Sequence, residues 1–258
     1  MYGTRVCGSL GDILADRNAS LAVRRQIPRV LRLIPDQRSV DVLVSSLGAP
    51  DPAIRTAVLK ALNRLRRSAP QLLFSAPAIN QHILNEVTEC FHLHTQRAAF
   101  GAAAPPRTVS ALLTKTLENR VRQSMERLFR LLALRYSPDE VYNAYLAIES
   151  GDPERVTPAH DYLDSLLERE IKRLFMPLLD SPDRISTHAR DLLHIQPKSL
   201  ETAVRELLLS GDSWLAVCAI ATAAELKLRG LAADIARAGE HAGKETVAVA
   251  RAAAATLA

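Results

Sequence analysis

The stretch GAPDPAIRTAVLKALNRL, from Gly48 to Leu65, decides the fold. Asp51 is placed to cap a helix N-terminus with its carboxylate, and Pro52 takes the first helical position, where a missing N–H costs nothing. The apolar residues that follow recur at helical spacing and form one stripe, which consists of Ile54, Val58, Ala61, Leu62 and Leu65. The stretch therefore predicts a helix that begins at Pro52 and lets neighbouring helices approach closely.

The same start signal returns further along the chain. GDPERVTPAHDYLDSLL begins at Gly151 and places Asp152 before a proline, and GDSWLAVCAIATAAEL begins at Gly211 with Asp212 in the capping position. The segment SPDE, residues 137–140, predicts a capping box in which Ser137 caps the helix and Glu140 reaches back to it. Several helices of one design are therefore expected.

The chain also repeats itself, which indicates stacked units. LAVRRQIPRVLRL, from Leu21, aligns with PAIRTAVLKALNRL at an offset of 31 residues, and a shorter helical pattern precedes each. One helix pair cannot bury its apolar face alone, whereas stacked pairs can. We predict one all-α solenoid over residues 1–258, with regular pairs over 1–67 and 197–258 and an irregular helical middle over 68–196 that carries a loop near 101–107.

Composition agrees with this fold class. Of the 258 residues, 48% are hydrophobic, 24% charged and 4% aromatic, and the commonest types are helix formers. The net charge of +5 tolerates an acidic partner, a nucleic acid or an anionic membrane but demands none of them. The cysteines are scattered at Cys7, Cys90 and Cys218, so we expect a reducing, cytoplasmic compartment rather than a disulfide framework. Neither a signal peptide nor a membrane span is predicted.

These helix pairs resemble HEAT repeats, through the D-P-x-[IV]-R start at Asp51 to Arg55 and the Ala/Leu-rich second helix. The resemblance implies that the turn Asp and the following Arg form a ladder between neighbouring repeats, which assigns Asp51 and Arg55 to it. Asp152 matches the turn position, although its arginine comes one residue early. Ala216 stands where Asp212 would need an arginine, so we expect the ladder to be broken there.

A second resemblance includes the middle of the chain. The run from Met125 to Asp180 is similar to the HEAT-repeat region of bacterial proteins in which such an array follows a nucleotide-translocase-like or major-facilitator-like transporter. The segment from Gly211 is similar to a D-P-W-L-R-A-C-A helix of the same proteins, with Ser213 in place of Pro and Ala216 in place of Arg. Membrane spans and a cyclic-nucleotide-binding module, which occur in those proteins, are not predicted in this sequence, so we expect the array alone, as a fragment or a stand-alone relative. The start at MYGTRV, already inside a helical pattern, favours a fragment.

One cluster offers metal ligands. His82, Glu86, Cys90 and His94 are spaced by four, so they share a face of one predicted helix. Side chains in a line along one helix can give a tetrahedral ion two ligands at a time. No CxxC or HExxH motif lies nearby to supply the others. The chain also lacks a nucleophile motif and a Gly-rich phosphate loop. We therefore predict no metal, no cofactor and no enzymatic activity.

The basic residues suggest where a partner binds, because Arg24, Arg25, Arg29 and Arg32 crowd one helix. We predict a non-catalytic scaffold that binds protein partners on the inner face formed by the second helices. The candidate interaction or ladder residues are Arg24, Arg25, Asp51, Arg55, Asp152, Asp212 and Trp214.

The partner implied by the second resemblance is a transporter domain of the same parent chain, with the array at the cytoplasmic face of the membrane. The alternative is a HEAT-like nucleic-acid-binding protein, or a DNA-glycosylase-type enzyme, that uses the basic inner face. The scarcity of aromatic residues weakens that alternative. A third kind of HEAT-like protein, the phycobilin lyases, is selected by no motif of this chain.

Overall fold

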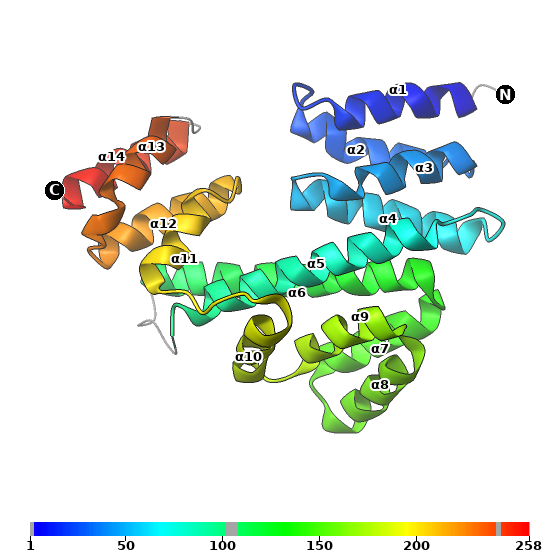
Figure 1. Ribbon diagram of the computed structural model, residues 1–258. Helices are drawn as coiled ribbons and strands as arrows, with labels where there is room; N and C mark the ends of the chain where they lie inside the picture. Colours follow the sequence, from blue (N-terminus) through cyan, green and yellow to red (C-terminus); the bar gives the residue numbers. More distant parts are fainter. Residues whose placement is uncertain (1–2, 102–107, 241–243, 258) are drawn as a thin grey trace. The chain divides into compact units, whose positions relative to one another are not determined.

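The computed structural model describes residues 3–101, 108–240 and 244–257. In these ranges it contains α-helices and short 3-10 turns and no strand (Figure 1). The predicted fold class, an all-α solenoid of HEAT-like helix pairs, is confirmed. The expected loop near 101–107 lies outside the described residues except for Gly101, whose φ of 67° is left-handed.

The chain divides into two compact units, which we describe separately. Unit 1 comprises residues 1–88 and 124–178, and unit 2 comprises residues 89–123 and 179–258. The divisions at 88/89 and 123/124 fall inside two long helices, α5 (Ala76–Ala98) and α6 (Val109–Arg135). None of the described helices is long and apolar enough to cross a membrane.

Unit 1 begins with two helix pairs. The first pair is α1 (Gly3–Ala15) and α2 (Leu21–Leu31), and the second is α3 (Gln37–Ser45) and α4 (Pro52–Ser68). First helix packs on first helix, α1 on α3, and second helix packs on second helix, α2 on α4 (Figure 1). These two pairs are the regular repeats that the offset of 31 residues predicted.

The turn before α4 forms as its sequence predicts. The carboxylate of Asp51 accepts hydrogen bonds from the backbone N–H groups of Ala53 and Ile54 at 2.8 and 3.0 Å, and Pro52 occupies the first turn. All five residues of the predicted apolar stripe are buried, and Leu62 is 0% exposed. The stripe thus forms the core between neighbouring helices.

Helices α7 (Pro138–Ser150), α8 (Pro153–Leu166) and α9 (Arg169–Phe175) complete unit 1, and α7 packs on α8. Asp152 caps α8 through the backbone N–H of Glu154, as predicted. The capping box predicted at Ser137 is wrong, because Ser137 makes no side-chain capping bond. Glu140 instead accepts a hydrogen bond from the Tyr162 hydroxyl at 2.9 Å, which ties α7 to α8.

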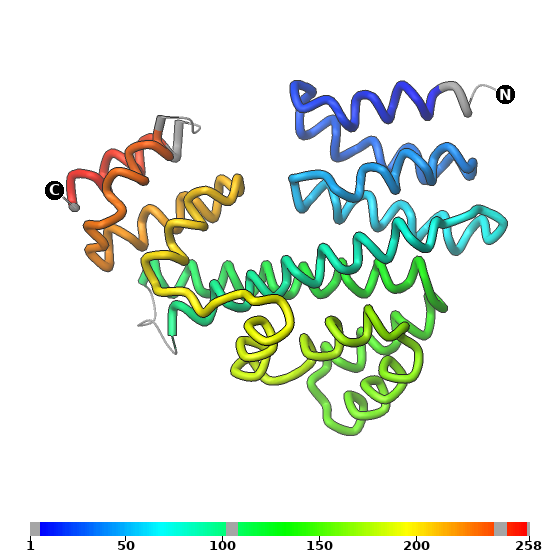
Figure 2. The backbone as a smooth tube through the Cα atoms, viewed as in Figure 1, coloured from blue at the N-terminus to red at the C-terminus, as the bar shows by residue number. Residues whose placement is uncertain are grey.

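Unit 2 contains α10 (Pro182–Leu193) and two further pairs, whose chain path Figure 2 follows from yellow to red. These pairs are α11 (Leu200–Leu208) with α12 (Ser213–Glu225), and α13 (Ala232–Glu240) with α14 (Lys244–Leu257). Again second helix packs on second helix, α12 on α14. Leu113 and Leu117 of α6 join the apolar core of α11 and α12.

A long-range contact holds the beginning of α6 within unit 2. The Glu225 carboxylate accepts the backbone N–H groups of Val109 and Ser110 at 3.1 and 2.8 Å. Burial raises the pKa of Glu225, but the bonds from Ser110 and Val109 outweigh burial and lower the pKa overall. A residue more than a hundred positions away thus satisfies N–H groups that a helix cannot satisfy itself.

Candidate interaction site on the second helices

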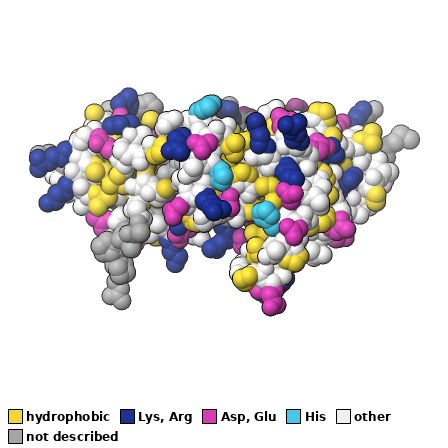
Figure 3. Space-filling model, turned by 60° about the horizontal axis from the view of Figure 1, so that its bottom comes forward, with side chains coloured by type: hydrophobic (Ala, Val, Ile, Leu, Met, Phe, Trp, Pro, Cys, Tyr) yellow, Lys and Arg dark blue, Asp and Glu magenta, His cyan; other side chains and the backbone are white. Residues whose placement is uncertain are grey.

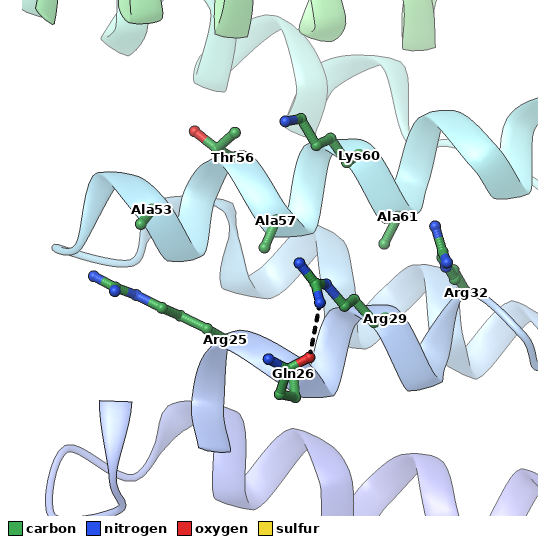
Figure 4. A pocket seen from close by; sticks show the side chains of 9 residues that line it. All are labelled: Arg25, Gln26, Arg29, Arg32, Ala53, Thr56, Ala57, Lys60 and Ala61. Atoms are coloured by element: carbon green, nitrogen blue, oxygen red, sulfur yellow. Dashed lines mark hydrogen bonds between the residues drawn. The ribbon is translucent and has the colours of Figure 1, made fainter. Parts of the chain in front are cut away.

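A groove of about 570 Å³ runs between α2 and α4, the second helices of the first two pairs. Figure 4 shows basic side chains of α2 opposite small side chains of α4. The groove is lined by Arg25, Gln26, Arg29, Arg32, Ala53, Thr56, Ala57, Lys60 and Ala61. We refer to these nine residues as the α2/α4 groove.

The α2/α4 groove carries an excess of positive charge. Arg25, Arg29 and Arg32 follow one another at about one helical turn along α2, and Lys60 adds a cation from α4. Only Arg25 has a carboxylate partner among the described residues, because Asp51 accepts its Nη2 at 3.1 Å. Arg29 donates to the neutral amide oxygen of Gln26 at 3.2 Å. The groove can therefore stabilise anionic groups.

The α4 side of the groove is lined by small residues. Ala53, Ala57 and Ala61 recur every four residues and so share one face of α4 (Figure 4). Thr56 directs its hydroxyl to the Pro52 carbonyl oxygen at 2.9 Å. Ala53 is exposed and Ala57 is partly exposed, so a ligand can lie close to the first turns of α4, whereas Ala61 is buried.

The predicted ladder exists at Asp51, but its cation differs from the predicted one. Asp51 pairs with Arg25 of the preceding second helix. Burial raises the pKa of Asp51, yet the Ile54 N–H and the Arg25 guanidinium together hold it below its usual value. Arg24 donates its Nε to the Leu14 carbonyl oxygen at 2.9 Å, so it secures the end of α1 and does not line the groove.

Arg55 turns toward its own loop and toward α5. Its Nη1 donates to the carbonyl oxygens of Ala49 and Pro50 at 3.0 and 3.2 Å, and its Nε lies 3.8 Å from the Glu86 carboxylate. Glu86 is 7% exposed and also accepts from Ser124 at 2.7 Å and from Arg127 Nη2 at 2.6 Å. Arg55 thus belongs to a buried polar network that joins α4, α5 and α6 within unit 1.

The remaining candidates lie apart from the groove. Ala216 supplies no cation at the repeat position of the ladder arginine, and Arg120 of the long helix α6 pairs with the Asp212 carboxylate instead, while Asp212 caps α12. Asp152 acts as the cap of α8. Trp214, in the first turn of α12, is 51% exposed. The structure therefore brings together Arg25 and Asp51 and places the other candidates elsewhere.

The predicted line of potential metal ligands lies along α5. Glu86 is held by Ser124 and Arg127, Cys90 is buried, and burial together with Arg97 lowers the pKa of His94 to about 4. Burial also lowers the pKa of His82. Within the described ranges, no group of three His, Cys, Asp or Glu side chains is arranged to hold a metal ion.

Two basic side chains at the end of α4, outside the groove, have partners within the protein. On the face seen in Figure 3, Lys and Arg side chains are interspersed with Asp and Glu. At the end of α4, Arg66 lies over the Phe74 ring at 5.4 Å and Arg67 pairs with Asp139 at 3.3 Å. The cations of the α2/α4 groove therefore form a local cluster.

The sequence singled out the arginines of α2 but missed Lys60, Thr56 and the alanine face of α4. Their spacing could have revealed them, since Ala53, Ala57 and Ala61 recur every four residues and Lys60 borders that line. Helical spacing assigns Ala61, with Ala57 beside it, to the apolar stripe of α4, so spacing alone does not distinguish a groove face from the core.

Stacked helix pairs with second-helix contacts and a turn Asp define the class of α-helical repeat proteins. Within this class, a family profile described as HEAT repeats matches residues 9–76, which contain the α2/α4 groove. No curated protein and no solved structure matches the chain.

Proposed function

We propose that the chain is a non-catalytic scaffold that binds a protein partner through the α2/α4 groove. The observation that carries this proposal is the groove itself, in which three cations without a carboxylate partner among the described residues lie near the exposed Ala53 and the partly exposed Ala57 of α4. HEAT repeats typically serve as protein-interaction scaffolds, and stacked repeats present their second helices as an extended binding surface.

A more specific proposal names the partner. We propose that the array regulates a membrane transporter from its cytoplasmic side, as a domain of the same parent chain or as a separate subunit. The similarity of Met125 to Asp180, and of the helix that begins at Asp212, to HEAT regions of transporter fusion proteins supports this form. The partner would then be a cytoplasmic segment of the transporter.

The groove also favours one alternative, the binding of nucleic acid, because arginine and lysine neutralise phosphates. Two observations weigh against this alternative. The groove contains no aromatic side chain on which a base could stack. The neighbouring cations Arg24 and Arg66 are engaged within the protein, although Arg64, one turn after Lys60, is exposed and has no ion pair among the described residues.

Photocrosslinking tests the proposal. A photoreactive phenylalanine analogue replaces Ala53 in the groove, and a matched variant carries it at the exposed Lys227 of unit 2. We expect a protein adduct at position 53 in cells, and we expect the identified partner, once purified, to rebind the wild-type chain. Adducts at position 227 alone, or nuclease-sensitive adducts at position 53, would contradict the proposal.

A further inference from the structure

The spacing of the groove cations indicates the kind of segment that fits them. We infer that the α2/α4 groove binds an extended acidic segment of a protein, with carboxylates at alternate positions such as Glu-x-Glu-x-Glu. This inference rests on the proposed function and specifies the chemistry of the partner. Its elements are the charge of the groove, the register of its arginines and the shape of the α4 side.

Charge comes first. Arg29, Arg32 and Lys60 have no carboxylate partner among the described residues, and the nine lining residues include no Asp or Glu. Like charges held near one another repel, so an anionic ligand relieves this repulsion as well as forming new ion pairs. The carboxylate of Asp51 pairs with Arg25 only, so Arg29 and Arg32 remain available to a ligand.

Register comes second. Arg25 and Arg29 of α2 and Arg32 at its C-cap are separated by four and then three residues, which is about 4.5–6 Å per step. In an extended chain, side chains two residues apart point to the same side and lie about 6.5–7 Å apart. Two alternate carboxylates can therefore meet Arg29 and Arg32, because long arginine side chains cover the small difference in spacing, and a third can share Arg25 with Asp51. Three consecutive acidic residues would direct the middle carboxylate away from the row.

Shape comes third. Ala53 and Ala57 leave room for the backbone of the segment to lie close to the first turns of α4, whereas Lys60 extends from α4 on the side away from α2 (Figure 4). A peptide chain is narrow enough to follow this line between two helices. The local cation cluster suits a short segment better than the evenly repeated phosphates of a nucleic acid.

Fluorescence anisotropy with the full chain tests the inference. The probes are two labelled nine-residue peptides of equal composition, with three Glu residues either at alternate positions or consecutive. We expect the alternate peptide to bind several-fold more tightly, with an affinity that falls as salt rises. Arg29→Glu/Lys60→Glu should weaken its binding at least about tenfold, which corresponds to about 1.4 kcal/mol. The matched control Lys227→Glu/Arg251→Glu, in unit 2, removes equal charge and should bind as the wild type does.

Folding of each variant is checked by circular dichroism, and Arg29→Gln/Lys60→Gln provides a gentler second variant that should weaken binding in the same direction. Equal binding of the two peptides, or equal loss with both charge-reversal pairs, overturns the inference. Tighter binding of a duplex DNA of about nine base pairs would favour the nucleic-acid alternative instead. A partner that crosslinks at position 53 but lacks an acidic extended segment would leave the proposed function standing while refuting this inference.

Discussion

Helices α4 and α12 begin alike and then diverge. Asp51 and Asp212 each cap their helix, each accepting two backbone N–H groups of the first turn, and each is paired with an arginine. When these two residues are aligned, Lys60 of α4 corresponds to Ala221 of α12, and Ala53 to Trp214. The two helices share a capping residue, but at the aligned positions α4 carries a cation where α12 carries an uncharged side chain.

The ladder arginines show the same divergence. Asp51 receives Arg25 from the second helix of the preceding pair, whereas Asp212 receives Arg120 from the long helix α6. The cation is supplied by whichever helix packs beside the turn, whatever its distance along the chain. The turn Asp is therefore a local signal, and its partner is set by the tertiary structure.

The largest expected effect comes from the buried stripe of α4. Leu62→Ala should lower the free energy of unfolding by about 2–5 kcal/mol, because Leu62 is fully buried and its truncation leaves a cavity. The aligned position in α12 is already Ala223, which is also fully buried, so Ala223→Leu should destabilise by overpacking, about 1–3 kcal/mol. Urea unfolding measures both.

The matched control is Leu33→Ala, whose side chain is 73% exposed and should change stability by about 0.5 kcal/mol or less. A loss below about 1 kcal/mol for Leu62→Ala would show that the assigned helix register is wrong.

Acid should act on unit 2 through His94. Burial and then Arg97 lower its pKa to about 4 from an ordinary 6.5, so the folded state disfavours the protonated form. The contribution of His94 to stability is therefore complete above pH 6.5 and is lost as the pH falls toward 4, by about 1–3 kcal/mol. Urea unfolding at pH 7 and at pH 4.5 measures this loss, which His94→Gln should reduce. An unchanged pH dependence in His94→Gln would refute this assignment.

The two ladder arginines should differ in their effect. Arg120 and Asp212 are 26% and 17% exposed, whereas Arg25 and Asp51 are 45% and 26% exposed. Arg120→Ala should therefore cost about 1–2 kcal/mol, and Arg25→Ala less than about 1 kcal/mol. Thermal unfolding of the two variants compares them, and an equal or reversed order would show that exposure does not decide the strength of these pairs.

The smallest expected effect on stability is that of the groove cations. Arg32→Ala and Lys60→Ala should each change the free energy of unfolding by about 0.5 kcal/mol or less, because neither side chain has an ion-pair partner among the described residues. Thermal unfolding checks this expectation. A loss of more than about 1.5 kcal/mol would assign these cations a structural role and remove them from the binding surface.

Local features of the fold could be predicted from the sequence. Helix starts were predictable at three aspartates, because a capping carboxylate accepts backbone N–H groups only two or three residues ahead. The structure confirms the caps at Asp51, Asp152 and Asp212. Ser137 shows the limit of this signal, because it makes no side-chain capping bond and Glu140 accepts a hydrogen bond from Tyr162 of the next helix instead.

Contacts between distant residues could not be predicted in this way. Arg120 reaches Asp212 and Glu225 reaches Ser110 across about a hundred residues of chain, so no local pattern records them. Its helical spacing makes Glu86 a potential metal ligand, but its carboxylate instead accepts hydrogen bonds from Ser124 and Arg127, which belong to another helix. For the groove, the sequence indicated the α2 arginines, and packing against α4 added Lys60 and the alanine face.

The most direct test of the central claim, that α4 rather than α12 carries the binding face, uses the alanines of the two helices as reporters. Ala53, Ala57 and Ala61 line the groove, whereas Ala216, Ala221 and Ala224 lie on α12 and are each partly exposed. The full chain, labelled at its alanine methyl groups, is titrated with the alternate acidic peptide and followed by NMR. We predict saturable shifts of the three groove methyl signals with those of α12 unchanged. Shifts confined to the α12 alanines, or no shifts at all, would contradict the account.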